Sequence, residues 1–144
     1  MLNAIFVSGI LAWAVAQIIK TALHAIKFNK VVMERFLGAG GMPSSHTAMV
    51  ISTLISVGKA EGTASTVFGI TCIFGAIVIY DAMGVRYAAG QHAKVLNVIN
   101  KKLSDDDNEE KPKELKEYLG HTPLEVLGGA VVGIIIGILM PIKG

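Results

Sequence analysis

The stretch PLEVLGGAVVGIIIGILMPI, residues 123–142, decides the kind of fold this chain can have. Glu125, near its start, is its only charged residue. A helix needs about 20 mostly apolar residues to cross the hydrocarbon core of a bilayer. Small residues such as glycine let a second helix approach the backbone closely in a membrane. The stretch therefore predicts a transmembrane helix that packs tightly against a neighbour.

Three further apolar stretches are Leu2–Ile19, Thr47–Val57 and Ala64–Tyr80. The first and third are long enough to span, whereas Thr47–Val57 gives a short span only if its helix starts near Ser44 and runs towards Lys59. Hydrophobic residues make up 52% of the chain and charged residues 17%, below the roughly 25% of a soluble domain. We therefore expect an all-α fold, an integral membrane helical bundle with about four transmembrane helices.

Two connections between these stretches are long and polar, Lys20–Pro43 and Arg86–Gly120, and one is a short turn, residues 58–63. Because two helices separate the long loops, both are expected on one side of the membrane, within a single domain of residues 1–144. Apolar residues at helical spacing in YAAGQHAKVLNVINKKL, residues 87–103, predict that the third helix continues beyond the membrane.

The positive charges are distributed unevenly over these loops. Eleven of the 13 Lys and Arg residues lie in or beside the long loops, and only Lys59 and Lys143 lie on the other side. The positive-inside rule then places the long loops in the cytoplasm, and a bacterial cytoplasmic membrane is the expected location. The alternative explanation is that some of these cations bind phosphate.

The stretch GGMPSSHTAMV, residues 40–50, combines a helix start with a histidine. Ser44 or Ser45 is a suitable N-cap, and Pro43 is common near a helix start. The N–H groups at such a start can bind an anion, and glycine lets the backbone approach it closely. His46 could there donate a proton to a leaving group. Helix capping alone explains the serines and the proline, but not His46.

A second histidine lies in LGHTPLEVLGG, residues 119–129. His121 and Glu125 are four residues apart, so they share one face of a helix that begins near Thr122. A carboxylate beside an imidazole fixes the tautomer of the ring and stabilises its charged form. A surface histidine with a solvated glutamate is the alternative interpretation.

The stretch YDAMGVRYAAGQH, residues 80–92, lies at the polar end of the third helix. Asp81 needs a cationic partner near the membrane boundary, and Arg86 has the forked geometry that binds phosphate. The alternative is an interfacial ion pair with Tyr80 and Tyr87 as aromatic anchors. All three segments reach the same membrane face, and this combination fits phosphoryl transfer, which depends on positioning and charge stabilisation.

Two of these segments resemble motifs of the type 2 phosphatidic acid phosphatases, relatives of the vanadium haloperoxidases, and most closely their small divergent membrane branch. PSSH, residues 43–46, resembles the motif Pro-Ser-Gly-His. HTPLEVLGG, residues 121–129, resembles the end of the motif Ser-Arg, five residues, His, three residues, Asp, with Glu125 replacing Asp. The resemblance implies that His121 is the nucleophile that forms a phosphohistidine, Glu125 its orienting carboxylate and His46 the general acid.

Beyond the substitutions at Ser45 and Glu125, the chain departs from the family pattern in the first motif and in the arrangement of the third. The first motif has Lys and Arg-Pro separated by six residues, whereas seven separate Lys27 from Arg35 and no proline follows. Arg86 precedes His92 by the family's five-residue gap, but Leu lies at the carboxylate position after His92. The third motif is therefore split, and we expect His121 rather than His92 to be the nucleophile.

The resemblance implies a membrane phosphatase, independent of metals and cofactors, that hydrolyses a lipid phosphate or pyrophosphate. Asp81 and His92 are candidates for supporting roles. The residues expected to bind the substrate phosphate are Lys27, Arg35, Ser44, Ser45 and Arg86. Expected partners are the lipid phosphate and membrane lipids but no nucleic acid, and a homodimer could replace packing that the family's six-helix core provides. The alternative is a non-catalytic phospholipid-binding or transport-associated membrane protein that retains the anion pocket.

Overall fold

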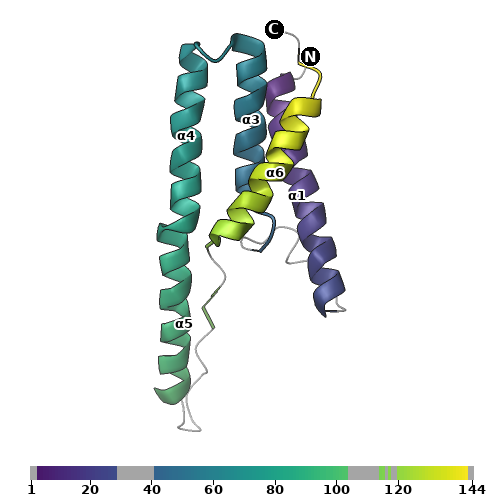
Figure 1. The fold of residues 1–144 in the computed structure, drawn as a ribbon. Helices are drawn as coiled ribbons and strands as arrows, with labels where there is room; N and C mark the ends of the chain where they lie inside the picture. Colours follow the sequence, from purple (N-terminus) through teal and green to yellow (C-terminus); the bar gives the residue numbers. More distant parts are fainter. Residues whose placement is uncertain (1–2, 29–40, 104–113, 116, 118–119, 143–144) are drawn as a thin grey trace.

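The structure is a computed structural model that describes residues 3–28, 41–103, 114–115, 117 and 120–142. All regular secondary structure in these residues is helical. The elements are α1 (Ala4–Phe28), α3 (Ser45–Glu61), α4 (Thr66–Met83), α5 (Val85–Leu103) and α6 (Pro123–Leu139). Because α5 continues α4 as one long rod, the residues that the structure describes form four helical rods (Figure 1). The structure confirms the expected all-α bundle and the continuation of the third helix beyond its apolar part.

The outer surface of the bundle suits a lipid environment. Two helical stretches, Ala4–Ile26 and Thr66–Lys102, are long and apolar enough to cross a membrane, and Pro123–Leu139 is a shorter apolar helix. Large apolar side chains such as Phe6 of α1 and Ile138 of α6 point outwards and are exposed. Lipid tails are as apolar as leucine, so this surface is stable in a bilayer. The fold is a membrane helical bundle.

The central helix is α3, which packs against α1, α4 and α6. Its seam with α1 is made by small polar side chains that are fully buried. The Ser8 hydroxyl of α1 lies 2.7 Å from the Ser52 hydroxyl and 2.8 Å from the Ser56 hydroxyl, both on α3. Hydroxyl groups away from water need such partners, so this cluster fixes how α1 and α3 are paired.

The seam between α3 and α6 is made by three glycines of α6, Gly129, Gly133 and Gly137, all of them buried. A Cβ at Gly133 would lie 2.6 Å from the backbone oxygen of Ala48, and one at Gly129 would overlap the backbone oxygen of Ser44. Only a residue without a side chain permits this approach of two backbones. The close packing expected from the sequence of residues 123–142 is confirmed.

One end of the bundle gathers the helix termini that surround the candidate site. The ends of α1 and α4 and the starts of α3 and α6 lie towards this end, and α5 continues beyond it, as expected for two long connections on one side (Figure 1). The first connection was predicted to begin at Lys20, which is wrong because α1 continues to Phe28. The residues of this extension, KTALHAIKF, include good helix formers, and their polar members do not interrupt the helix.

Candidate functional site

The first turn of α3 carries His46. Of the two candidate N-caps, Ser44 and Ser45, the N-cap is Ser44. Its side chain accepts hydrogen bonds from the Thr47 N–H at 3.3 Å and from the Thr47 hydroxyl at 3.0 Å. Ser44 and Thr47 are buried, so the cap is shielded from solvent. This fixed turn presents the half-buried His46 at the end of the bundle.

The start of α6 carries His121 and Glu125. Thr122 is the N-cap, and the Glu125 carboxylate accepts the Thr122 N–H at 2.9 Å to complete a capping box. The same carboxylate oxygen lies 3.3 Å from Nδ1 of His121. His121 is only 4% exposed, so its interpretation as a surface histidine is wrong. Glu125 therefore both caps the helix and orients the imidazole.

The segment before α6 docks onto the junction of α4 and α5. The His121 N–H donates a hydrogen bond to the backbone oxygen of Ala82 at 3.0 Å. A Cβ at Gly120 would overlap the backbone of Tyr87, so only glycine allows this contact. These two contacts bring His121 to the turn of helix that carries Arg86. The two parts of the split third motif, far apart in sequence, are neighbours in the fold.

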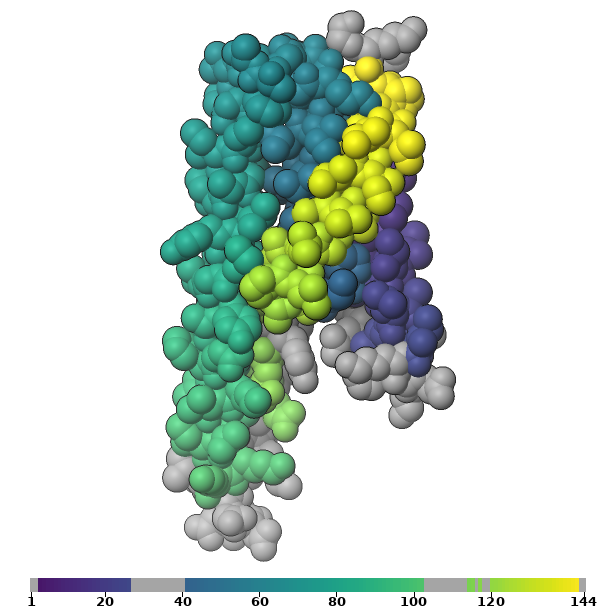
Figure 2. All heavy atoms as spheres, in the orientation of Figure 1, coloured from purple at the N-terminus to yellow at the C-terminus, as the bar shows by residue number. Residues whose placement is uncertain are grey.

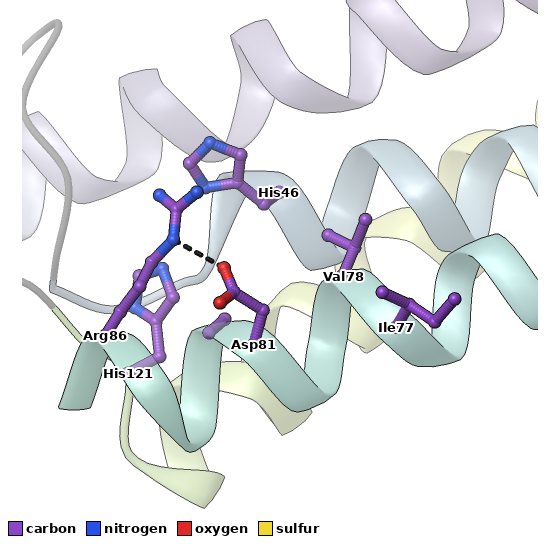
Figure 3. A pocket seen from close by; sticks show the side chains of 7 residues that line it. His46, Ile77, Val78, Asp81, Arg86 and His121 are labelled. Atoms are coloured by element: carbon purple, nitrogen blue, oxygen red, sulfur yellow. Dashed lines mark hydrogen bonds and ion pairs between the residues drawn. The ribbon is translucent and has the colours of Figure 1, made fainter. Parts of the chain in front are cut away.

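His46, His121 and Arg86 line one pocket of about 180 Å³, together with Asp81, Ile77, Val78 and Ala82 (Figure 3). The ring centroids of His46 and His121 are 6.4 Å apart and the ring planes are tilted by 52°. The two rings are therefore close neighbours at a tilted angle, and both border the same pocket. The pocket draws its side chains from α3, from the α4–α5 junction and from the segment before α6.

Arg86 is held by the carboxylate of Asp81. Its Nε lies 2.7 Å from Oδ2 of Asp81, and the two side chains are 53% and 39% exposed. The expected cationic partner of Asp81 is thus Arg86. Because this contact uses Nε, the terminal nitrogens of the guanidinium point towards the ring of His46 (Figure 3). An ion pair this exposed adds little stability, so a stronger anion could compete with Asp81 for Arg86.

Burial lowers the pKa of His121 below its ordinary value of 6.5. The hydrogen bond and negative charge of Glu125 act in the opposite direction, and the positive charges of Lys20 and Arg86 lower the pKa further. The imidazole is consequently neutral at pH 7. If Nδ1 carries the proton and donates it to Glu125, Nε2 keeps a lone pair, which is the form required of a nucleophile.

Lys20 is a cation near the pocket that the sequence interpretation did not include in the site, since it was assigned to a loop. It lies within α1 and is only 4% exposed. A Cβ at Gly41, just before α3, would lie 3.7 Å from its Cγ and Cδ atoms. Its charge influences His121, so it contributes positive potential to the pocket. The available signal was a lysine inside an apolar helical stretch, which by default indicates function.

The serines of PSSH have structural roles in this arrangement. The Ser44 N–H donates to the backbone oxygen of Glu125 at 2.9 Å, and the Ser44 side chain caps α3. A phosphate contact at Ser44 would have to displace one of these bonds. Ser45 is buried in the first turn of α3 and does not line the pocket. Their predicted phosphate contacts remain predictions.

The remaining predicted residues lie away from the pocket or outside the described part of the chain. His92 is exposed on α5 and does not line the pocket. Arg35 and the side chain of Lys27 lie outside the described residues. Of the predicted site residues, the structure thus brings together His46, His121, Glu125, Arg86 and Asp81.

The fold and the pocket define the class of protein: an all-helical membrane bundle with two histidines and an arginine around one pocket near an end of the bundle. A family model described as the Divergent PAP2 family matches residues 1–136, and the chain belongs to this family. It is 35% identical to the uncharacterized membrane protein YuiD of Bacillus subtilis (strain 168), over 96% of this chain and 94% of the relative. No solved structure matches the chain at a significant level. The family resemblance seen in the sequence is therefore confirmed.

Proposed function

We propose that the chain is a membrane phosphatase that hydrolyses a lipid phosphate or pyrophosphate through a phosphohistidine. The observation that carries this proposal is the pocket lined by His46, His121 and Arg86, in which the centroids of the two imidazole rings are 6.4 Å apart. Membership of a PAP2-related family supports it. Arg86 and Lys20 supply positive charge for the phosphate, and Lys27 and Arg35 are further candidates.

In the first step, Nε2 of His121 attacks phosphorus and the bond from phosphorus to the leaving oxygen breaks. Burial and the nearby charges of His121, Arg86 and Lys20 lower the pKa of His46 in the free protein, and the negative charge of a bound phosphate favours its protonated form. The protonated ring donates its proton to that oxygen, so the leaving group departs as an alcohol or a phosphate. Glu125 holds Nδ1 of His121 and stabilises the positive charge that develops on the ring. Arg86 stabilises the charge on the transferred group.

In the second step, water attacks the phosphohistidine. The neutral His46 accepts a proton from the water as the new P–O bond forms and the N–P bond of His121 breaks. Inorganic phosphate is released, and both histidines return to their starting protonation states. As proposed, neither step uses a metal ion.

The direct test is phosphate release from purified protein in detergent, with phosphatidate, phosphatidylglycerophosphate and a polyprenyl pyrophosphate as substrates. We expect release from at least one of them and inhibition by vanadate, which mimics the five-coordinate transition state of phosphoryl transfer. Saturable binding of all three lipids without any release would contradict the proposal.

The pH dependence of kcat/KM is expected to report the ionisation of His121. Only its neutral form is nucleophilic, so on the acid side activity rises with pH through a pKa that lies below 6.5. Activity falls again at higher pH, where His46 loses the proton that it must donate to the leaving group. In Glu125→Gln the pKa-raising contributions of the carboxylate disappear, so the acid limb shifts to lower pH. The maximal rate falls by about 10²–10⁴-fold because the ring loses its orienting partner. Both proteins are measured with the same substrate, so the substrate's own ionisation affects both profiles equally. An acid limb that moves to higher pH in Glu125→Gln contradicts the assignment of this limb to His121.

A non-catalytic phospholipid-binding protein is the second candidate. The Asp81–Arg86 ion pair favours it, because the carboxylate already neutralises an arginine that a phosphatase needs for its substrate. This candidate predicts vanadate and lipid phosphate binding at the same pocket with no turnover and no phosphorylated histidine. Detection of phosphate release or of a phosphohistidine excludes it.

We place the pocket at the cytoplasmic face of a bacterial cytoplasmic membrane, because most cations of the chain belong to the loops at that end. His92 is exposed near this end and offers a position for labelling. In a Cys72→Ser background, His92→Cys should react with a membrane-impermeant thiol reagent in inside-out vesicles and not in intact cells. Labelling in intact cells alone would place the pocket on the outer face.

A further inference from the structure

We propose that Ile77 and Val78 of α4 bind the hydrocarbon next to the substrate phosphate, and that the substrate class is an alkyl or isoprenoid chain attached directly to that phosphate. This inference rests on the proposed function only in assuming that the polar side of the pocket binds the phosphate group. It adds a structural reason why the protein prefers one class of lipid phosphate over the others.

The pocket has two chemically different sides. His46, His121 and Arg86 form a polar side, whereas Ile77 and Val78 form an apolar wall (Figure 3). Ile77 is 60% exposed although it lines the pocket, so the pocket is open towards the outer, lipid-facing surface of α4. Figure 2 shows α4 along one edge of the molecule, on its outer surface. A lipid substrate can therefore enter sideways along this helix.

The position of Ile77 and Val78 in the pocket determines which substrate atoms they contact. Ile77 and Asp81 are four residues apart and occupy the same face of α4, one helical turn of about 5.4 Å from each other. Because Asp81 holds Arg86, a phosphate bound by Arg86 places its first few attached atoms beside Ile77 and Val78. Polar groups at these atoms would lose water without gaining a hydrogen-bond partner from the wall. A hydrocarbon chain bonded directly to phosphate has no polar groups at these atoms, whereas a glycerolipid has ester groups at them.

The competing explanation is that Ile77 is simply one lipid-facing residue among several on α4. Ile73 provides a matched control, because it is the same residue type one turn earlier and is 65% exposed. It does not line the pocket. If lipid contact were the only role of this face, substitutions at Ile73 and Ile77 would have equal effects.

The experiment measures binding of two non-hydrolysable ligands, decylphosphonate and methylphosphonate, to the detergent-solubilised protein and to Ile77→Ala and Ile73→Ala. In Ile77→Ala we expect the affinity for decylphosphonate to fall about five- to tenfold, as for the loss of one or two methylene-sized contacts. The affinity for methylphosphonate should stay within about twofold, and Ile73→Ala should change neither. Ile77→Trp places a larger side chain in the space that the hydrocarbon would occupy, so it should weaken decylphosphonate binding more than Ile77→Ala.

Equal effects of Ile77→Ala and Ile73→Ala on decylphosphonate would overturn the inference, as would an unchanged affinity in Ile77→Ala. A short-chain phosphatidate that binds as well as decylphosphonate and is equally sensitive to Ile77→Ala would overturn the choice of a directly attached chain. Since phosphonates are not cleaved, the outcome does not depend on turnover. A protein with the expected binding pattern but no phosphate release would refute the proposed function and leave this inference supported.

Discussion

Replacing His121 with alanine is expected to lower the rate of phosphate release by at least about 10⁴-fold, the scale seen when an enzyme loses its nucleophile. The reason is geometric. His121 is buried, oriented by Glu125 at 3.3 Å and directed into the pocket that Arg86 and His46 share. His46→Ala should cost about 10²–10⁴-fold, because a leaving group can depart slowly without a general acid.

His92→Ala is the matched control, since it removes the same side chain from an exposed position on α5. It should retain wild-type activity, and all three variants should keep the thermal stability of the parent within a few degrees. If His92→Ala were inactive and His121→Ala active, the nucleophile would be His92 and the assignment made from the pocket would be wrong.

Replacing Gly133 with leucine is expected to separate α3 from α6 and to destabilise the protein by about 3 kcal/mol or more, the upper part of the range for overpacking. A Cβ alone would approach the backbone oxygen of Ala48 to 2.6 Å and the Cβ of Ile51 to 2.9 Å. Backbone atoms of two packed helices cannot move aside as a flexible side chain can. The midpoint of thermal unfolding in detergent should fall by about 10 °C.

Gly69→Leu makes the same substitution in α4, where a Cβ would meet nothing within 4 Å. It should leave the midpoint unchanged or raise it slightly, since leucine is a better helix former than glycine. A similar loss of stability in both variants would show that glycine flexibility, and not the close approach of α3 and α6, determines the effect.

The sequence was sufficient for the features that depend on local chemistry. The apolar stretches predicted the helices of the bundle because hydrophobic length sets the number of spans. The spacing of His121 and Glu125 predicted their contact, and the need of Asp81 for a partner predicted its ion pair. Each of these inferences involves residues within one helix or across one junction.

The features that depend on packing between helices could not be predicted in the same way. Lys20 was assigned to a loop because charge commonly ends an apolar stretch, yet its burial follows from how α1 packs beside the start of α3. The meeting of Arg86 with His121 depends on Gly120 against Tyr87, a contact between segments more than 30 residues apart in sequence. The apolar wall of Ile77 and Val78 became visible only once the pocket was located.

The most direct test of the central claim, that His46, His121 and Arg86 form one phosphoryl-transfer site, is to look for the covalent intermediate. The protein is incubated with a ³²P-labelled lipid phosphate, and the reaction is quenched in alkali because phosphohistidine is stable under alkaline conditions. The labelled residue is then identified by mass spectrometry. We expect label on His121 in the wild-type protein and none in His121→Ala. Phosphate release with no label on His121, or with label on His92, would contradict it.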